Sequence, residues 1–127
     1  MTQEIPFPKP LPKLFEQLLS ENRNSDVNHL TKIVDEYFAF AKKSLNDNEF
    51  IDIDSAALLT KVSHYLISQF DNLSEDDKRY VVAAIYYFVE SDDEEHDFDS
   101  MFGFEDDIEV MNYVLEKIGH AHKKIEI

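Results

Sequence analysis

The hydrophobic pattern of this chain is organised around one uninterrupted apolar run of ten residues, 80–89. Such a run is compatible with a buried helix or a buried strand, and its flanks decide between them. Ser74 and Asp77 have the spacing of a capping box, in which the hydroxyl accepts an amide hydrogen and the acid reaches back. The acidic residues that open the segment also face the positive end of a helix dipole. The sequence therefore predicts a helix over about 75–90, central in the fold because it is apolar all round.

Four further segments carry apolar residues at helical spacing and predict helices over about 12–20, 27–45, 55–71 and 105–118. Their inward-facing residues are Leu11, Leu14, Phe15, Leu18 and Leu19; Val27, Leu30, Ile33, Val34, Tyr37, Phe38 and Ala41; Leu59, Val62, Leu66 and Phe70; and Ile108, Met111, Leu115 and Ile118. The predicted fold class is therefore all-α, a compact bundle of four to five helices around the central one. Short connections favour antiparallel neighbours.

Residues at the ends of these segments suit helix caps. Ser25 or Asp26 is placed to cap the second helix, and Asp52 or Asp54 the third. Gly119 is placed to stop the last helix, and we expect a frayed turn after it.

The chain length and the few helix breakers indicate a single helical domain over 1–127. Of the 127 residues only two are Gly and four are Pro. A sheet protein of this size would need turn residues far more often. The prolines alternate along the first twelve residues, at Pro6, Pro8, Pro10 and Pro12. This spacing predicts an extended arm over 1–12. The arm is either a strap docked on the bundle or a ligand for a proline-recognising domain.

An acidic segment, residues 91–104, joins the last two predicted helices. Eleven Asp or Glu and no Lys or Arg occur from 90 to 109. Four large apolar side chains are interspersed among them, Phe98, Met101, Phe102 and Phe104. A disordered acidic tract would lack such aromatics. We therefore predict an ordered acidic loop whose aromatic residues insert into the bundle and whose carboxylates face water.

Four carboxylates in and after this loop form the candidate site: Asp93, Asp97, Asp106 and Asp107. Carboxylates beside a helix start can converge on a divalent cation, which prefers several oxygen ligands in a flexible cage. The preferred interpretation is that they accept backbone amides and cap the helix. An EF-hand loop starting at Asp47 or at Asp97 fails the required ligand pattern. No catalytic role is assigned, because acid–base pairs with tuned pKa values usually lie in apolar clefts.

Other candidate residues carry weaker signals. His96 sits among acids that would favour its charged form, so it is either a pH sensor or a solvated side chain. His120 and His122 are two residues apart and would face different sides of a helix. The tyrosines at helical spacing either line a pocket or, as is more common, belong to the core: Tyr65, Tyr80, Tyr86 and Tyr87. The sequence contains no Gly-rich phosphate loop, nucleophile elbow, HExxH motif or basic patch.

The stretch from the central helix to the last one resembles the YkvA-like family of small uncharacterised helical domains. The family has an apolar helix, Pro-x-Asp-x-x-Pro-Asp, a spacer, Gly-x-x-Asp-Asp and a second apolar helix. The matching positions here are Asp93, Asp97, Gly103, Asp106 and Asp107. The family's prolines fall on Ser91, His96 and Ser100, and its apolar loop residues on Asp92, Glu94 and Glu95. The resemblance implies a helical fold and no particular chemistry.

The formal net charge of −15 bears most directly on function. It repels nucleic-acid backbones and anionic lipids and attracts basic proteins and divalent cations. With no Cys there is no thiol chemistry, and no apolar run is long enough to span a bilayer. The first residues lack the features of a signal peptide, which predicts a soluble cytoplasmic protein.

Three function hypotheses follow from these features. The favoured one is a non-enzymatic interaction or regulatory module without a cofactor, whose partner is a protein with a basic surface. The second is a divalent-metal-binding protein or metal-dependent enzyme that uses the loop carboxylates. The third is an acidic mimic of nucleic acid, which would need its charges at phosphate-like spacing.

Overall fold

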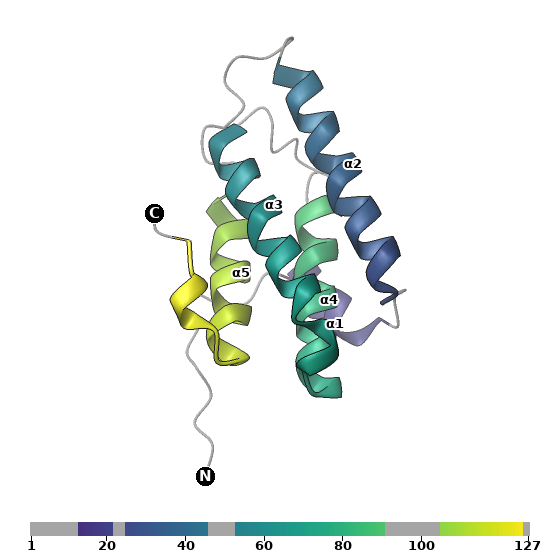
Figure 1. Cartoon of the computed structure of the whole chain (residues 1–127), viewed down its shortest axis with the longest axis vertical. Coiled ribbons are helices and arrows are strands. Elements are labelled where there is room, and N and C mark those ends of the chain that lie inside the picture. Colours follow the sequence, from purple (N-terminus) through teal and green to yellow (C-terminus); the bar gives the residue numbers. More distant parts are fainter. Residues whose placement is uncertain (1–12, 22–24, 46–52, 91–104, 126–127) are drawn as a thin grey trace.

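The computed structural model describes residues 13–21, 25–45, 53–90 and 105–125. These residues form α-helices and short 3₁₀ turns, with no strand among them, which confirms the predicted all-α bundle (Figure 1). The helices are α1 (Lys13–Ser20), α2 (Val27–Leu45), α3 (Ile53–Ser68), α4 (Glu75–Glu90) and α5 (Glu105–Lys117). The 3₁₀ turns described are η1 (Phe70–Asn72) and η3 (Ala121–Lys123).

Consecutive helices from α2 to α5 run in alternating directions (Figure 1). The helices α2 and α4 run toward the upper end of the bundle in this view and α3 and α5 run away from it, although α4 ends and α5 begins lower than α2 ends. We call this the loop end, because the connections 46–52 and 91–104 join helices at it. The opposite end holds the start of α4 and the end of α5.

Helix α4 is the centre of the bundle, as its apolar run predicts. It packs against α1, α2, α3 and α5. Every residue from 81 to 88 is buried, with no polar side chain other than the two tyrosine hydroxyls in that stretch. Around it the core is closed by residues of the other helices, including Phe15, Leu30, Leu66 and Met111.

The start of α4 confirms one half of the predicted capping box. The amide of Asp77 donates to the Ser74 hydroxyl at 3.1 Å. The carboxylate of Asp77 accepts a hydrogen bond from Lys117 of α5 instead of reaching back. A long-range ion pair thus replaces the local contact that the motif predicts.

Other helix ends agree with the sequence in part. Asp26, not Ser25, caps α2, since its Oδ1 accepts the Asn28 amide at 2.8 Å. Of the two residues predicted to cap the third helix, Asp54 lies inside it, because α3 begins at Ile53, and Asp52 lies outside the described residues. The same helix ends at Ser68 rather than near residue 71, where the chain tightens into η1.

The chain leaves α5 through Gly119, which has φ of +87°. The His120 amide donates to Leu115 O at 2.7 Å and the Gly119 amide to Glu116 O at 3.2 Å, the bond pair of a Schellman cap. The segment beyond it is not a frayed turn, because Asn112 bonds both backbone groups of Ile125, at 2.7 and 2.8 Å. Ile125 is buried as a result.

Candidate functional site

The structure describes two of the four carboxylates of the candidate site. Asp106 and Asp107 occupy the first turn of α5, where Asp106 is exposed and Asp107 is 1% exposed. Successive helix residues point in different directions, so one carboxylate meets solvent while its neighbour enters the bundle. Asp93 and Asp97 lie outside the described residues. Both the metal interpretation and the capping interpretation therefore stay predictions.

Several other predictions also fall outside the described residues. These are the ordering of the acidic loop 91–104 with its aromatic residues, the arm 1–12, and the role of His96. Within the described ranges, no group of three or more His, Asp or Glu side chains is placed to hold a metal ion. The helices of these ranges include none that is both long and apolar enough to cross a membrane.

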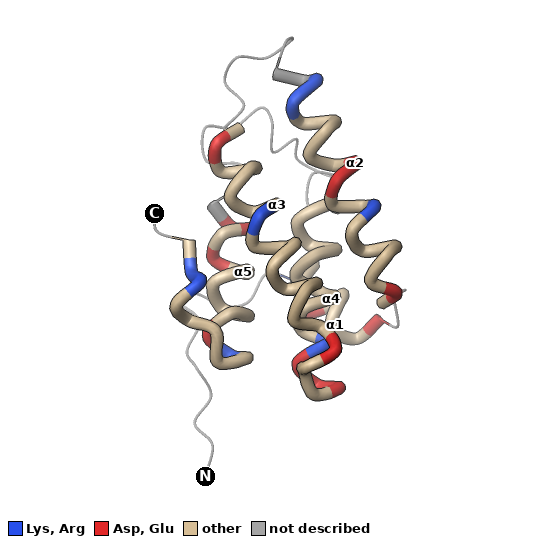
Figure 2. Tube along the Cα trace, viewed as in Figure 1, with Lys and Arg blue, Asp and Glu red and all other residues tan. Residues whose placement is uncertain are grey.

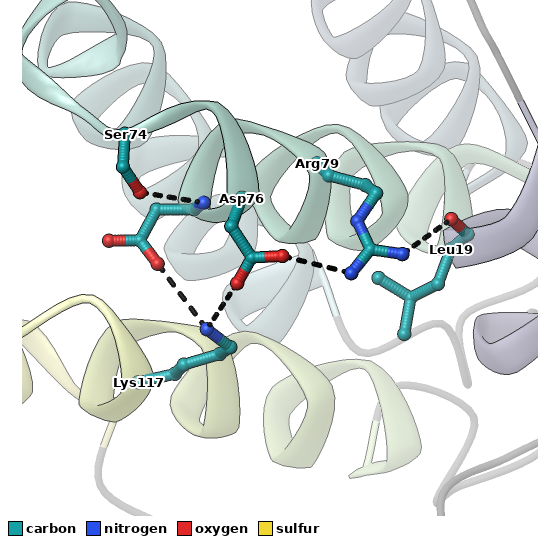
Figure 3. Close-up of polar contacts among 6 residues, drawn as sticks. Leu19, Ser74, Asp76, Arg79 and Lys117 are labelled. Atoms are coloured by element: carbon teal, nitrogen blue, oxygen red, sulfur yellow. Dashed lines mark hydrogen bonds and ion pairs between the residues drawn. The ribbon is translucent and has the colours of Figure 1, made fainter. Parts of the chain in front are cut away.

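A charge network at the opposite end from the loop connections is the most developed polar cluster of the described chain (Figure 3). Lys117, in the last turn of α5, donates from Nζ to Asp76 Oδ2 at 3.1 Å and to Asp77 Oδ1 at 3.3 Å. The same ammonium lies 4.2 Å from the ring centroid of Tyr80, a cation–π contact. The acids stand at the N-terminus of α4 and the lysine at the C-terminus of α5, so each charge also complements its own helix dipole.

Arg79 extends this network to the first helix. Its guanidinium donates to Asp76 Oδ1 at 2.9 Å and to the backbone oxygen of Leu19 at 3.3 Å. The bond to Leu19 satisfies a carbonyl in the last turn of α1 that the helix leaves without an internal partner. The cluster therefore fastens α1, α4 and α5 together at one end of the bundle.

The network shifts the pKa of two of its members. Hydrogen bonds from Arg79 and then Lys117 hold the pKa of Asp76 below its usual range, against a smaller opposing effect of burial. Burial by itself lowers the pKa of Lys117, but the bonds to Asp76 and Asp77 outweigh it and the pKa is raised. Both shifts favour the charged forms, which is the behaviour of a structural ion pair and not of a proton-transfer group.

A cavity of about 420 Å³ lies beside this network, between the end of α1, η1 and the start of α4. Its charged lining includes Glu75, Lys78 and Arg79. Lys78 pairs with Glu75 at 3.3 Å, and Arg79 with Asp76. These three charged groups of the lining are thus each paired with a neighbouring side chain.

The histidines make contacts between elements. His64 Nε2 lies 2.6 Å from Asp35 Oδ1 and links the exposed sides of α3 and α2. The hydroxyl of Tyr65 and Nδ1 of His120 share a hydrogen bond of 2.5 Å. His120 and His122 were expected on different faces of a continuing helix. Because the chain turns at Gly119, their ring centroids are 5.9 Å apart.

The sequence alone did not indicate the Lys117 network. Asp76 and Lys117 are 41 residues apart, and pairs at this separation have no local pattern. The usable signal was indirect: acids in a first turn and a lysine in a last turn match in charge if the two helix ends meet.

Comparison of the chain with protein-family models, with curated proteins and with solved structures finds no match. These comparisons leave the resemblance to the YkvA-like family as a prediction.

Proposed function

We propose that this protein is a non-enzymatic interaction or regulatory module that binds a basic surface of another protein at its loop end. The observation that carries the proposal is the direction of the helices: α2 and α4 run toward the loop end, and α3 and α5 run away from it (Figure 1). The two connections at that end, 46–52 and 91–104, together contain nine Asp or Glu and no Lys or Arg. The topology thus brings two acidic stretches without a basic residue toward one end.

The charges at the opposite end do not offer a comparable surface. There the acids that open α4 pair with Lys78, Arg79 and Lys117, and Figure 3 shows the pairs made by Arg79 and Lys117. At the loop end, Lys42 and Lys43 in the last turn of α2 offset part of the negative charge. Exposed Asp54 and Asp106 in the first turns of α3 and α5 add to it. The nine acids of the two connections, together with Asp54 and Asp106, therefore lie toward the loop end.

An excess of one sign at one end directs association with partners of opposite charge. The electric field of such an excess raises the association rate constant. Added salt weakens this attraction, because the Debye length is only about 8 Å at physiological ionic strength. A protein with a basic surface is therefore the favoured partner.

The experiment titrates the protein with an octalysine peptide while backbone amide signals are followed by NMR. We expect the largest shifts at the helix ends of the loop end, and an affinity that falls as salt is added. The triple variant Asp92→Asn, Glu94→Gln, Glu95→Gln should weaken binding severalfold, because three charges leave the loop end.

A matched variant carries three neutral substitutions elsewhere: Glu16→Gln, Glu36→Gln and Asp71→Asn. It has the same net charge as the first triple variant but keeps all the acids of the loop end. It should therefore bind octalysine more tightly than the first triple variant does. Equal weakening by the two variants would show that only net charge matters and would overturn the proposal.

Metal binding by Asp93, Asp97, Asp106 and Asp107 is the alternative. Calorimetry with Ca²⁺, Mg²⁺ and Mn²⁺ tests it directly. A tight site that Asp97→Asn abolishes would replace the interaction proposal. If the only heat is that of nonspecific binding, the metal alternative is ruled out.

A further inference from the structure

A groove of about 490 Å³ runs between α3 and the segment that follows α5. Its lining comes from two parts of the chain far apart in the sequence: Leu58, Lys61, Val62 and Tyr65 of α3, and His122, Lys123, Lys124 and Ile125. The blue positions on α3 and on the C-terminal segment lie on the same side of the bundle in Figure 2. This volume falls in the range of roughly 300–1,000 Å³ that is usual for small-molecule sites.

The floor of the groove is apolar. Leu58, Val62 and Tyr65 follow one another at i, i+4 and i+7 and so form a stripe along α3. Ile125 faces them from the other wall and is buried. Leu58 is 45% exposed, and among the described residues only Phe40 is another large hydrophobic side chain with such exposure. The groove thus presents apolar surface that the bundle does not cover.

The polar groups of the groove are basic in a protein of net charge −15. Among the described residues, three lysines and one histidine line it and no Asp or Glu does. Lys61 forms no hydrogen bond or ion pair with the described part of the chain. Lys123 lies 5.0 Å from the ring centroid of Tyr65, and Lys124 pairs with Glu116 at 3.1 Å outside the lining. Lys61 and Lys123 therefore remain available to an anionic group.

Hydrogen bonds hold the two walls in place. Tyr65 is tied to His120, and Asn112 fixes both backbone groups of Ile125. A groove whose walls are already ordered needs little rearrangement on binding, so less of the binding energy is lost to ordering side chains and backbone.

We propose that this groove binds a small carboxylate with an apolar body, the body on the Leu58–Val62–Ile125 floor and the carboxylate at Lys61 and Lys123. The overall charge of the protein sets the class of ligand. A polyanion such as a nucleic acid is repelled by the summed field, whereas a ligand with one negative charge feels the local lysines more than the distant acids. The site is independent of the loop end and of the function proposed for it.

Octanoate is the probe, titrated into the full chain and followed by calorimetry and by the amide signals of α3 and residues 121–125. We expect saturable binding at one site with shifts confined to the groove. Octanol lacks the charge and acetate lacks the apolar body, so both should bind at least several times more weakly.

Substitutions at exposed positions separate this site from nonspecific binding. Lys61→Gln should weaken octanoate about three- to fivefold, as loss of an exposed ion pair predicts. Leu58→Ser should weaken it about fivefold through lost apolar contact. Their matched controls, Lys32→Gln and Phe40→Ser, remove a lysine and an exposed large hydrophobic side chain outside the groove and should leave the affinity unchanged.

Three outcomes would overturn the proposal. The first is equal binding of octanol and octanoate, and the second is equal weakening by a groove variant and its control. The third is a dimer, seen by sedimentation, that octanoate dissociates, because a second copy of the chain would then be the occupant of the groove.

Discussion

Phe88 offers the sharpest perturbation of the packing around α4. Its side chain is fully buried, and its ring meets that of Tyr37 from α2 in an edge-to-face arrangement with 5.0 Å between centroids. Replacing a fully buried Phe by Ala typically costs about 3–5 kcal/mol, because apolar contact is lost and a cavity remains. Domains have total stabilities of only about 5–15 kcal/mol, so Phe88→Ala should remove a large part of it. Phe88→Leu keeps most of the volume and should cost about 1–1.5 kcal/mol.

Urea denaturation followed by circular dichroism measures both losses as shifts of the unfolding midpoint at unchanged slope. The matched control is Phe40→Ala on α2, whose side chain is 54% exposed. We expect that control to stay within about 0.5 kcal/mol of the parent. A cost below about 1 kcal/mol for Phe88→Ala, or an equal cost for the two alanine variants, would refute the central position of α4.

Two further substitutions test contacts that fasten the ends of the chain. Lys117→Met removes the cation shared by Asp76 and Asp77, and urea midpoints across pH measure the effect. Because the pKa of Asp76 is lowered in the fold, its stabilisation is present above its usual pKa of 3.8 and is lost as pH falls below it. The pKa of Lys117 is raised, so its stabilisation holds below 10.5 and is lost as pH rises above that value. The unfolding free energy of the parent should therefore exceed that of Lys117→Met most between pH 3.8 and pH 10.5. A difference in unfolding free energy that does not change with pH would contradict the ion pair. Asn112→Ala removes two hydrogen bonds to Ile125 and should cost about 1–2 kcal/mol, with faster hydrogen exchange at the Ile125 amide; unchanged exchange there would show that Asn112 does not hold the segment.

The helices were predictable because their signals are local. The apolar run and Ser74 lie within a few residues of the α4 boundaries that they determine, and the predicted limits 75–90 match the structure. The third helix was placed less well. Its first residues, Ile53 and Asp54, belong to a polar stretch where the apolar period has not yet begun.

The contacts between helix ends were not predictable, because they depend on how the helices pack. Lys117 meets Asp76 only when α4 and α5 lie antiparallel with matched ends, and no spacing in the sequence encodes that match. The same holds for the C-terminal segment. Asn112 and Ile125 are 13 residues apart, and nothing near either residue shows that they pair. The groove on α3 was missed for this reason, since its second wall depends on that pairing.

Hydrogen exchange of the backbone amides tests the central position of α4 most directly. Amides of a fully enclosed helix open only with global unfolding, whereas those of peripheral helices open locally at lower free energy. We predict that residues 81–88 exchange most slowly in the chain, with the free energy of opening equal to the unfolding free energy from urea. Exchange in this stretch as fast as in α1 would contradict the central burial of α4.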